Sequence, residues 1–383
     1  MSANRLAQLQ QALDERAAQQ LLRTPVTLQQ YNGRLLTVAG RHFINFCGND
    51  YLGLATAPQV LQAFADGAMQ LGAGSSGSPM VTGQHTVHQQ LCDSLCDWLD
   101  VERVLLFSSG FAANQAMLLT LSNKNDSLLL DKLSHASLID AALHSDATLK
   151  RFAHNDVTAL HALLSQVKQP MVVTEGVFSM DGDSPDLPAM LKLCQQFNAP
   201  LLLDDAHGLG VLGPQGRGAA AAQGVTQQQL YCTMANFGKA LGVGGAFLAG
   251  SKTVIDYIEQ FGRHYIYSTA LPPALCAAVL KSVALCRSES WRRDKLQSNI
   301  ALFRHLATDL PLLNSQTAIQ GLVLGSSQRA VAASVQLKQA GIWLSAIRPP
   351  TVPQGSARLR ITLSAQHTEQ DIHQLVQQLR QLV

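Results

Sequence analysis

The stretch Tyr231–Gly245, YCTMANFGKALGVGG, carries one lysine, Lys239, between a single glycine and a glycine-rich run. Glycine permits backbone angles and close approaches that other residues rarely adopt. A lysine on such a loop can lie against a flat ligand. In a dry pocket its amine would lose part of its proton affinity and become a nucleophile. Taken alone, the stretch also fits a surface turn with a solvated lysine, because lysines are mostly exposed.

A second stretch upstream, Ala199–Gly210, has the sequence APLLLDDAHGLG. Its three leucines are typical of a short parallel strand that is buried on both faces. Asp204 and His207 follow at the predicted carboxyl end, where open α/β sheets bind ligands. An aspartate beside a lysine loop suits pyridoxal phosphate, since Asp204 would keep the pyridine nitrogen protonated and Lys239 would form the Schiff base. The alternative is an aspartate that caps the next element.

Four more apolar runs are expected to be strands: Arg103–Phe107, Leu128–Asp131, Met171–Glu175 and Phe247–Ala249. Each ends in small or polar residues, and helical patterns lie between the runs. The chain is therefore expected to be an α/β protein with a mainly parallel, doubly wound sheet and a ligand crevice along one edge. A nicotinamide cofactor fits the same pattern, but no G-x-G-x-x-G opens the first helix after a strand.

The turn Ser108–Phe111 stands between a predicted strand and the helical pattern AANQAMLLTL. Free N–H groups and the dipole at a helix N-terminus form an anion site. We therefore expect a cofactor phosphate on Gly110 and Phe111. Without a ligand, the same pattern is only an ordinary turn between a strand and a helix.

Three motifs together resemble a known family: TEGVFSMDGD, then DDAHG, then FGKALG. Their order and spacing resemble the α-oxoamine synthases, which are fold-type I pyridoxal phosphate enzymes. The resemblance covers nearly the whole chain, including the segment Ile347–Pro353. It implies an acyltransferase with pyridoxal 5'-phosphate as a Schiff base on Lys239. The most similar branch condenses L-alanine with a pimeloyl thioester, carried by acyl carrier protein or coenzyme A, in biotin biosynthesis. Alternatives are glycine C-acetyltransferase, 5-aminolevulinate synthase, or a cofactor-free binding protein on this fold.

The resemblance implies roles for individual residues around the cofactor. His135 would stack on the pyridine ring and also contact substrate, Ser179 would contact the cofactor, and His207 would hydrogen-bond the ring phenol oxygen. Ser268 and Thr269 would reach the phosphate of the neighbouring subunit, which implies a homodimer with shared active sites.

The resemblance also implies substrate contacts. Arg23 would reach the acyl substrate, and Thr351 would also bind substrate. Asn49 of the NDYLGL motif would lie near the amino acid, and Arg360 would grip the amino-acid carboxylate. A guanidinium fork suits a carboxylate. Since adjacent strand residues point to opposite faces, we expect only one of Arg358 and Arg360 to face the site.

One position departs from the family pattern. The family commonly has threonine three residues before the lysine, where its hydroxyl donates to the phosphate, and this chain has Asn236. An amide also donates, so Asn236 remains a candidate cofactor ligand.

A chain of 383 residues suits one large domain and a smaller one. We expect an N-terminal helix and arm over 1–45, a cofactor domain over 46–285 and a small α/β domain over 286–383. Within these, a first helix should run to about Leu22 and a long helix to Leu310. Apolar runs at 318–324, 341–347 and 358–363 should be strands around a helix near 330–339, and Thr368 should start the last helix.

The composition excludes several classes of protein. Hydrophobic residues make up 47% and charged residues 14%, and the net charge is +2, as in globular proteins. No block of like charge indicates a nucleic acid or membrane partner. The N-terminus lacks an apolar signal region, and the seven cysteines fit reduced thiols, so we expect a cytoplasmic protein. Cys92 and Cys96 are expected to pack in the core, and no metal site is expected.

Overall fold

The computed structural model describes residues 2–19 and 21–382. Its largest sheet has seven strands in the order β4-β10-β9-β8-β7-β5-β6. These strands are β4 (Arg103–Phe107), β5 (Ser127–Asp131), β6 (Thr148–Phe152), β7 (Pro170–Glu175), β8 (Leu201–Asp204), β9 (Cys232–Asn236) and β10 (Ala246–Gly250). β10 runs antiparallel to both neighbours, while the other strands share one direction. The mainly parallel sheet is therefore confirmed.

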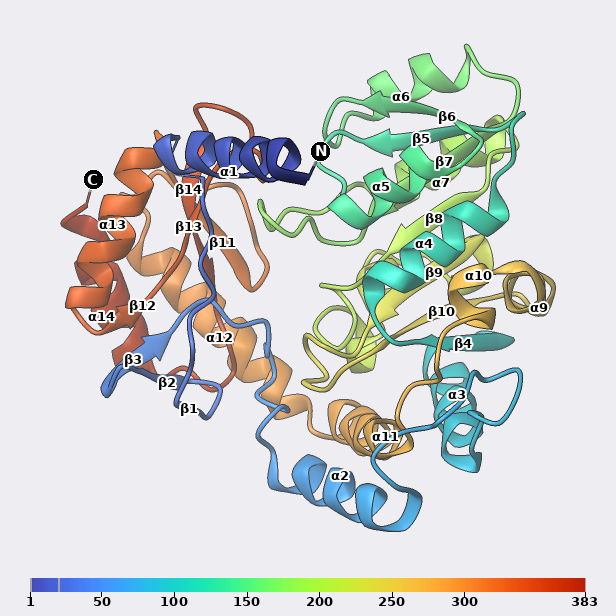
Figure 1. The fold of residues 1–383 in the computed structure, drawn as a ribbon, viewed down its shortest axis with the longest axis horizontal. Coiled ribbons are helices and arrows are strands. Elements are labelled where there is room, and N and C mark those ends of the chain that lie inside the picture. Colours follow the sequence, from blue (N-terminus) through green and yellow to red (C-terminus); the bar gives the residue numbers. More distant parts are fainter. Residues whose placement is uncertain (1, 20, 383) are drawn as a thin grey trace.

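Helices cover both faces of this sheet (Figure 1). They are α2 (Pro58–Leu71), α3 (Thr86–Leu99), α4 (Gly110–Leu121), α5 (Ala136–His144), α6 (Val157–Leu164), α7 (Leu187–Gln196), α8 (Ala219–Ala222), α9 (Lys252–Phe261), α10 (Arg263–Ile266) and α11 (Pro273–Ser288). Neighbouring leucines of one strand enter different cores. Leu202 packs with α4, α5 and α9 on one face, whereas Leu201 and Leu203 pack with α6 and α7 on the other. Burial on both faces explains why these strands are apolar throughout.

The rest of the chain forms a second lobe in Figure 1. It contains the sheets β1-β2-β3-β12 and β11-β14-β13. Its elements are α1 (Ser2–Ala18), β1 (Gln30–Tyr31), β2 (Leu35–Val38), β3 (Arg41–Asn45), α12 (Ser290–Leu306), β11 (Ile319–Gly325), α13 (Ser327–Gln339), β12 (Ile342–Trp343), β13 (Ala346–Ile347), β14 (Ala357–Thr362) and α14 (Glu369–Arg380). Thr368 caps α14 in a capping box with Asp371, as predicted.

Several predicted boundaries were wrong. The run 341–347 is two short strands, β12 and β13, that belong to different sheets. The long helix is interrupted at Glu289, whose backbone is not helical (φ −95°, ψ 70°), and α12 ends at Leu306. α1 ends at Ala18, whereas we expected the first helix to run to about Leu22.

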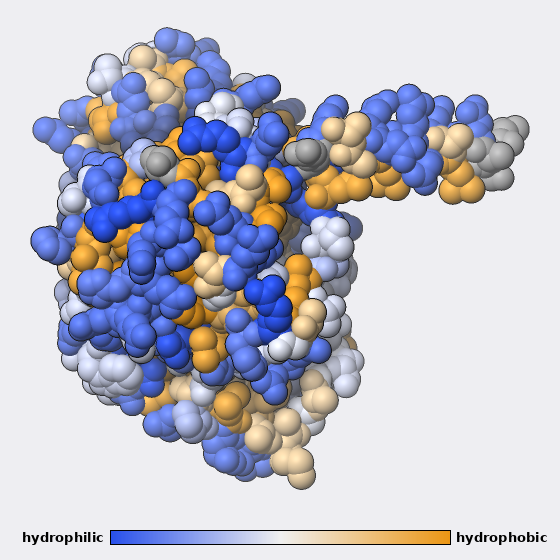
Figure 2. All heavy atoms as spheres, turned by 90° about the vertical axis from the view of Figure 1, so that its left-hand side faces the viewer, coloured by the Kyte–Doolittle hydropathy of each residue, from blue (hydrophilic) through white to orange (hydrophobic). Residues whose placement is uncertain are grey.

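The helix α1 projects from the body of the molecule with apolar residues along one side (Figure 2). Leu6, Leu9 and Leu13 are exposed, at 66%, 58% and 50%. The apolar side of α1 is thus uncovered in a single chain. No helix within the described residues is long and apolar enough to cross a membrane.

The lysine stretch contains β9 and the connection from β9 to β10. Phe237 N donates to Gly245 O (2.9 Å), and Gly242 N donates to Lys239 O (2.9 Å). Gly242 has φ +67°, and a Cβ there would lie 2.2 Å from the Ala55 backbone nitrogen. Glycine is therefore required at 242 by both backbone angle and space.

Replacement of Gly242 by alanine is expected to lower the midpoint of thermal unfolding by about 4 °C or more, because strain and a backbone clash both oppose the new methyl group. Gly238→Ala is the matched control. Gly238 lies in the same turn, but its φ is not positive and the nearest atom to an added Cβ is 3.9 Å away. Equal midpoints for the two variants, measured by circular dichroism, would contradict this account.

Candidate active site

A cavity of about 130 Å³ lies at the carboxyl ends of the central strands. It is lined by residues from β8 and β9, from the N-termini of α4 and α5, and from the lysine turn. The sequence-predicted residues among them are Gly110, Phe111, His135, Asp204, His207, Asn236 and Lys239. Residues that come from distant parts of the sequence thus meet in one place.

The Lys239 amine is the central group of this cavity. Burial lowers the pKa of Lys239 below its usual value, the charge of Arg360 lowers it further, and the charges of Asp204 and Glu175 oppose the shift. A lysine with a lowered pKa has a larger fraction of neutral amine, which is the nucleophilic form.

Asp204 is the carboxylate that is directed into the cavity. Asn114 Nδ2 donates to its Oδ2 (2.8 Å), and the Ala206 backbone N–H donates to its Oδ1 (3.0 Å). The neighbouring Asp205 instead accepts from Ala219 N (2.9 Å) and does not line the cavity. Burial raises the pKa of Asp205 to about 8. Of the two adjacent aspartates, Asp204 is placed to contact a ligand.

His207 is buried beside Asp204. Its Nδ1 lies 2.7 Å from the Tyr51 hydroxyl, which leaves Nε2 for a ligand. Burial lowers the pKa of His207 well below its usual value, and the charges of Lys239 and Arg360 act in the same direction. The ring is therefore neutral near pH 7.

The sequence patterns gave no role to four further residues of the site, Glu175, Asn114, Ser137 and Tyr51. Glu175 ends β7, lines the cavity and accepts from the His135 backbone N–H. Burial, together with the charge of Asp204, raises the pKa of Glu175 well above its usual value. The sequence offered one indication that Glu175 belongs to the site. It ends a predicted strand, and the carboxyl ends of parallel strands lie at one edge of the sheet.

The turn at which we expect the cofactor phosphate is the N-terminus of α4. Gly110 is the first residue of α4, and Ser109 caps the helix by accepting from Ala112 N (3.2 Å). The amide of Asn236 packs against Gly110, since a Cβ on Gly110 would lie 3.6 Å from its Nδ2. Asn236 Oδ1 is buried and has no hydrogen-bond partner within the described chain. Of the two amide atoms, Nδ2 is the one that can donate to an anionic ligand at the helix N-terminus.

Ser268 and Thr269 do not line this cavity in the single chain. Ser268 Oγ donates to His264 O (2.6 Å), and Thr269 is exposed. Their contact with a cofactor therefore remains a prediction that involves a second subunit.

Arg358 and Arg360 correct one of our expectations. They are two residues apart on β14, so their side chains point to the same face of the strand, not to opposite faces. Arg360 Nε donates to Ser179 O (2.6 Å), and its Nη2 donates to Asn49 Oδ1 (3.2 Å). Arg358 pairs with Asp181 (2.9 Å). The two arginines differ in their partners: Arg358 is neutralised by a carboxylate, whereas Arg360 contacts neutral oxygens.

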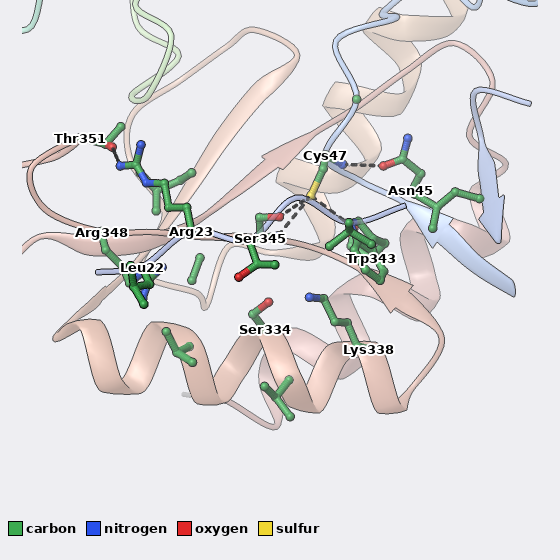
Figure 3. Close-up of a pocket in the computed structure, with 18 of the residues that line it drawn as sticks. Leu22, Arg23, Asn45, Cys47, Ser334, Lys338, Trp343, Ser345, Arg348 and Thr351 are labelled. Atoms are coloured by element: carbon green, nitrogen blue, oxygen red, sulfur yellow. Dashed lines mark hydrogen bonds between the residues drawn. The ribbon is translucent and has the colours of Figure 1, made fainter. Parts of the chain in front are cut away.

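A larger cavity of about 800 Å³ lies between the N-terminal arm and α13 (Figure 3). Arg23 Nη2 donates to Thr351 Oγ1 (2.8 Å) in its wall. Leu22, Val331 and Val335 contribute apolar surface, and none of the described residues that line it is acidic. Gly48 also lines it and directly precedes Asn49, so this cavity adjoins the Arg360 contact. Arg23 and Thr351 thus meet in the wall of this cavity, and their contact with substrate remains a prediction.

The smaller cavity fits pyridoxal phosphate. It offers an amine for the aldehyde, a buried carboxylate for the ring nitrogen and a helix N-terminus for the phosphate. The Asn236 amide lies against Gly110, the first residue of α4, and its N–H groups are the donors that a phosphate there would need. No group of His, Cys, Asp and Glu within the described residues could hold a metal ion, and all seven cysteines are free.

Comparison with known proteins identifies the family. The model of the aminotransferase class I and II family matches residues 41–379, so the chain belongs to that family. Within it, the chain is 48% identical to the 8-amino-7-oxononanoate synthase of Vibrio cholerae over 378 residues (98% of this chain, 97% of the relative). It is 46% identical to that of Photobacterium profundum over 382 residues (98% and 96%). The chain therefore belongs to the family of the 8-amino-7-oxononanoate synthases.

Solved structures give the same result for the fold. The serine palmitoyltransferase of Sphingomonas wittichii superimposes with a TM-score of 0.93 at 28% identity, covering 98% of this chain and 97% of that one. The 8-amino-7-oxononanoate synthase of Francisella tularensis gives 0.79 at 32% identity, covering 88% and 97%. The fold-type I assignment is confirmed.

Proposed function

We propose that this protein condenses L-alanine with a pimeloyl thioester and releases 8-amino-7-oxononanoate, carbon dioxide and the carrier thiol, a step of biotin biosynthesis. The observation that carries the proposal is a pair of cavities in one chain. One is lined by Lys239 and Asp204, and the other has apolar and cationic walls that suit an anionic acyl chain. Arg360 donates to Asn49, and Gly48, which directly precedes Asn49, lines the larger cavity. The identity of 46–48% to named synthases supports the choice of substrates.

In the amino-acid half, the residues bind alanine and move one proton. Arg360 holds the carboxylate and so orients the Cα–H bond toward Lys239. Lys239, with its lowered pKa, accepts the Cα proton as general base. When bound, pyridoxal phosphate takes up the electron pair that this proton leaves behind. Asp204 keeps the ring nitrogen protonated, while His135, Ser179 and His207 contact the cofactor.

In the acyl half, the larger cavity binds the pimeloyl chain. Arg23 and Thr351 bind the acyl substrate, and the apolar wall of Leu22 and Val335 packs against its methylene groups. Arg23 and Lys338 are cations on the wall of the same cavity, which suits a substrate that carries anionic groups (Figure 3).

The assembly and location are part of the same proposal. A homodimer would bring Ser268 and Thr269 of the partner to the phosphate, and the uncovered leucines of α1 are available for contact between subunits. The seven free thiols support a reducing, cytoplasmic compartment. The arm over 1–45, the cofactor domain over 46–285 and the small domain over 286–383 remain the proposed division of the chain.

Asn236→Ala is expected to weaken pyridoxal phosphate binding by about ten- to a hundredfold, because a hydrogen bond to a charged group contributes about 1.5–3 kcal/mol. Asn236→Thr should restore most of the affinity through its hydroxyl. The dissociation constants of the three proteins, measured by absorbance titration, check this. If the alanine variant stays within about threefold of the wild type, Asn236 only fills the turn.

A product assay tests the proposed function as a whole. Alanine, glycine and serine are each combined with pimeloyl and acetyl thioesters of coenzyme A and of acyl carrier protein, and the products are identified by mass spectrometry. We expect 8-amino-7-oxononanoate from alanine and a pimeloyl thioester as the dominant product. A preference for glycine with the acetyl thioester would indicate glycine C-acetyltransferase instead. Colourless protein that ignores added pyridoxal phosphate would indicate a binding protein.

A further inference from the structure

His154 follows β6 and has no task in the reaction described above. Its Nδ1 lies 2.9 Å from Asp131 Oδ1, and its Nε2 lies 2.8 Å from Asp183 Oδ2. Carboxylates accept hydrogen bonds, so both ring nitrogens donate. Burial lowers the pKa of His154, but the hydrogen bonds and charges of Asp131 and Asp183 outweigh burial and raise the pKa to about 10. The ring is therefore cationic at neutral pH.

The two carboxylates belong to two different loops of the site. Asp131 ends β5 and accepts from Leu133 N (2.7 Å), in the segment that leads to His135. Asp183 closes the loop after β7, where its carbonyl accepts from Phe178 N (2.9 Å). Figure 1 shows β5, β6 and β7 side by side, so His154 bridges the ends of neighbouring strands.

The loop 178–183 is the segment that contacts both arginines of β14. Ser179 O accepts from Arg360 Nε, and Asp181 pairs with Arg358. On the same side, Gly182 O accepts from Ser315 Oγ (2.8 Å). The ring of His154 meets Phe178 edge-on, with centroids 4.5 Å apart. The loop is thus held by the second lobe on one side, and on the other by His154 and by Asn155, whose Nδ2 donates to Asp183 Oδ2 (2.8 Å).

We propose that His154 is a positioning residue: by bridging Asp131 and Asp183 it fixes the loop 178–183, and through the Ser179 carbonyl it sets the orientation in which Arg360 binds the amino-acid carboxylate. This inference rests on the proposed function for the role of Arg360. Neither His154 nor its two carboxylate partners line the 130 Å³ or the 800 Å³ cavity. Binding of the thioester should therefore be independent of the bridge.

The first test is the His154→Gln variant of the cofactor-loaded enzyme. Glutamine keeps a donor and loses the charge. We expect KM for alanine to rise about tenfold, the effect of losing about one charged hydrogen bond, while kcat and KM for the thioester stay within about threefold. His161→Gln is the matched control, because that exposed ring also meets a phenylalanine, Phe197, edge-on (5.4 Å). It should not change KM for alanine.

The second test needs no activity. Amide hydrogen exchange in loop 178–183 should accelerate in His154→Gln, whereas exchange in β8 should be unchanged. Asp183→Asn weakens the less buried end of the bridge. This variant replaces His154→Gln in the exchange experiment if His154→Gln does not fold. In the double variant His154→Gln/Asp183→Asn, exchange in the loop should be no faster than in the more strongly affected single variant, because both substitutions act through one bridge.

If exchange in the loop is unchanged in His154→Gln, the proposal that His154 fixes the loop is wrong. Faster exchange with an unchanged KM for alanine would overturn the link to Arg360. A wild type that fails to use alanine would refute the proposed function instead, and the exchange result would still decide whether His154 holds the loop.

Discussion

Replacement of Lys239 by alanine is expected to lower turnover by about three orders of magnitude or more, while the fold is kept. The substitution removes the covalent anchor of the cofactor and the proposed general base together. The cofactor should still bind, weakly, through the α4 N-terminus and Asp204. Steady-state assays with alanine and a pimeloyl thioester measure the first effect. Borohydride treatment followed by mass spectrometry measures the second, since only the wild type should retain the mass of the cofactor.

The matched control is Lys192→Ala. Lys192 is an exposed lysine of α7 that lines neither cavity. This variant should keep both turnover and the borohydride-stable mass. Substantial turnover in Lys239→Ala would remove Lys239 from the proposed mechanism.

The central sheet was predictable where strands are buried on both faces. β5, β7 and β8 are short apolar runs because their side chains enter cores on either side. β6 was missed because Lys150 and Arg151 interrupt its apolar pattern, as its place at the edge of the sheet permits. β9 was missed because it lies inside the stretch that we had interpreted as a loop. The direction of β10 depends on pairing, which no local pattern encodes.

The site was predictable where chemistry and position coincide. Lys239, Asp204 and His207 carry reactive groups at the ends of recognisable strands. Tyr51 and Asn114 were missed because their roles are set by partners far away in the chain: Tyr51 contacts His207, and Asn114 contacts Asp204. The error over Arg358 was one of geometry, since residues two apart on a strand share a face.

Asp204→Asn is expected to slow exchange of the alanine Cα proton with deuterated solvent by about a hundredfold or more, the usual cost of losing one stabilising group in an active site. An amide has nearly the same shape as the carboxylate and can keep a contact to Asn114, but it carries no negative charge to hold the ring nitrogen protonated. Cofactor binding should therefore persist while proton removal becomes slow. Nuclear magnetic resonance of alanine in deuterated water measures the exchange directly and needs no thioester.

Asp205→Asn is the matched control for this test. Asp205 is adjacent to Asp204 and is also buried, but we assign it no contact with the cofactor. Its carboxyl accepts from Ala219 N and does not line the cavity. Burial, together with the charge of Asp204, raises the pKa of Asp205 to about 8, so the group is mostly neutral at pH 7 and an amide is a close substitute. Exchange in Asp205→Asn should stay near the wild-type rate. If instead Asp204→Asn exchanges normally and Asp205→Asn does not, the pyridine partner is Asp205, and the geometry we assign to the site is wrong.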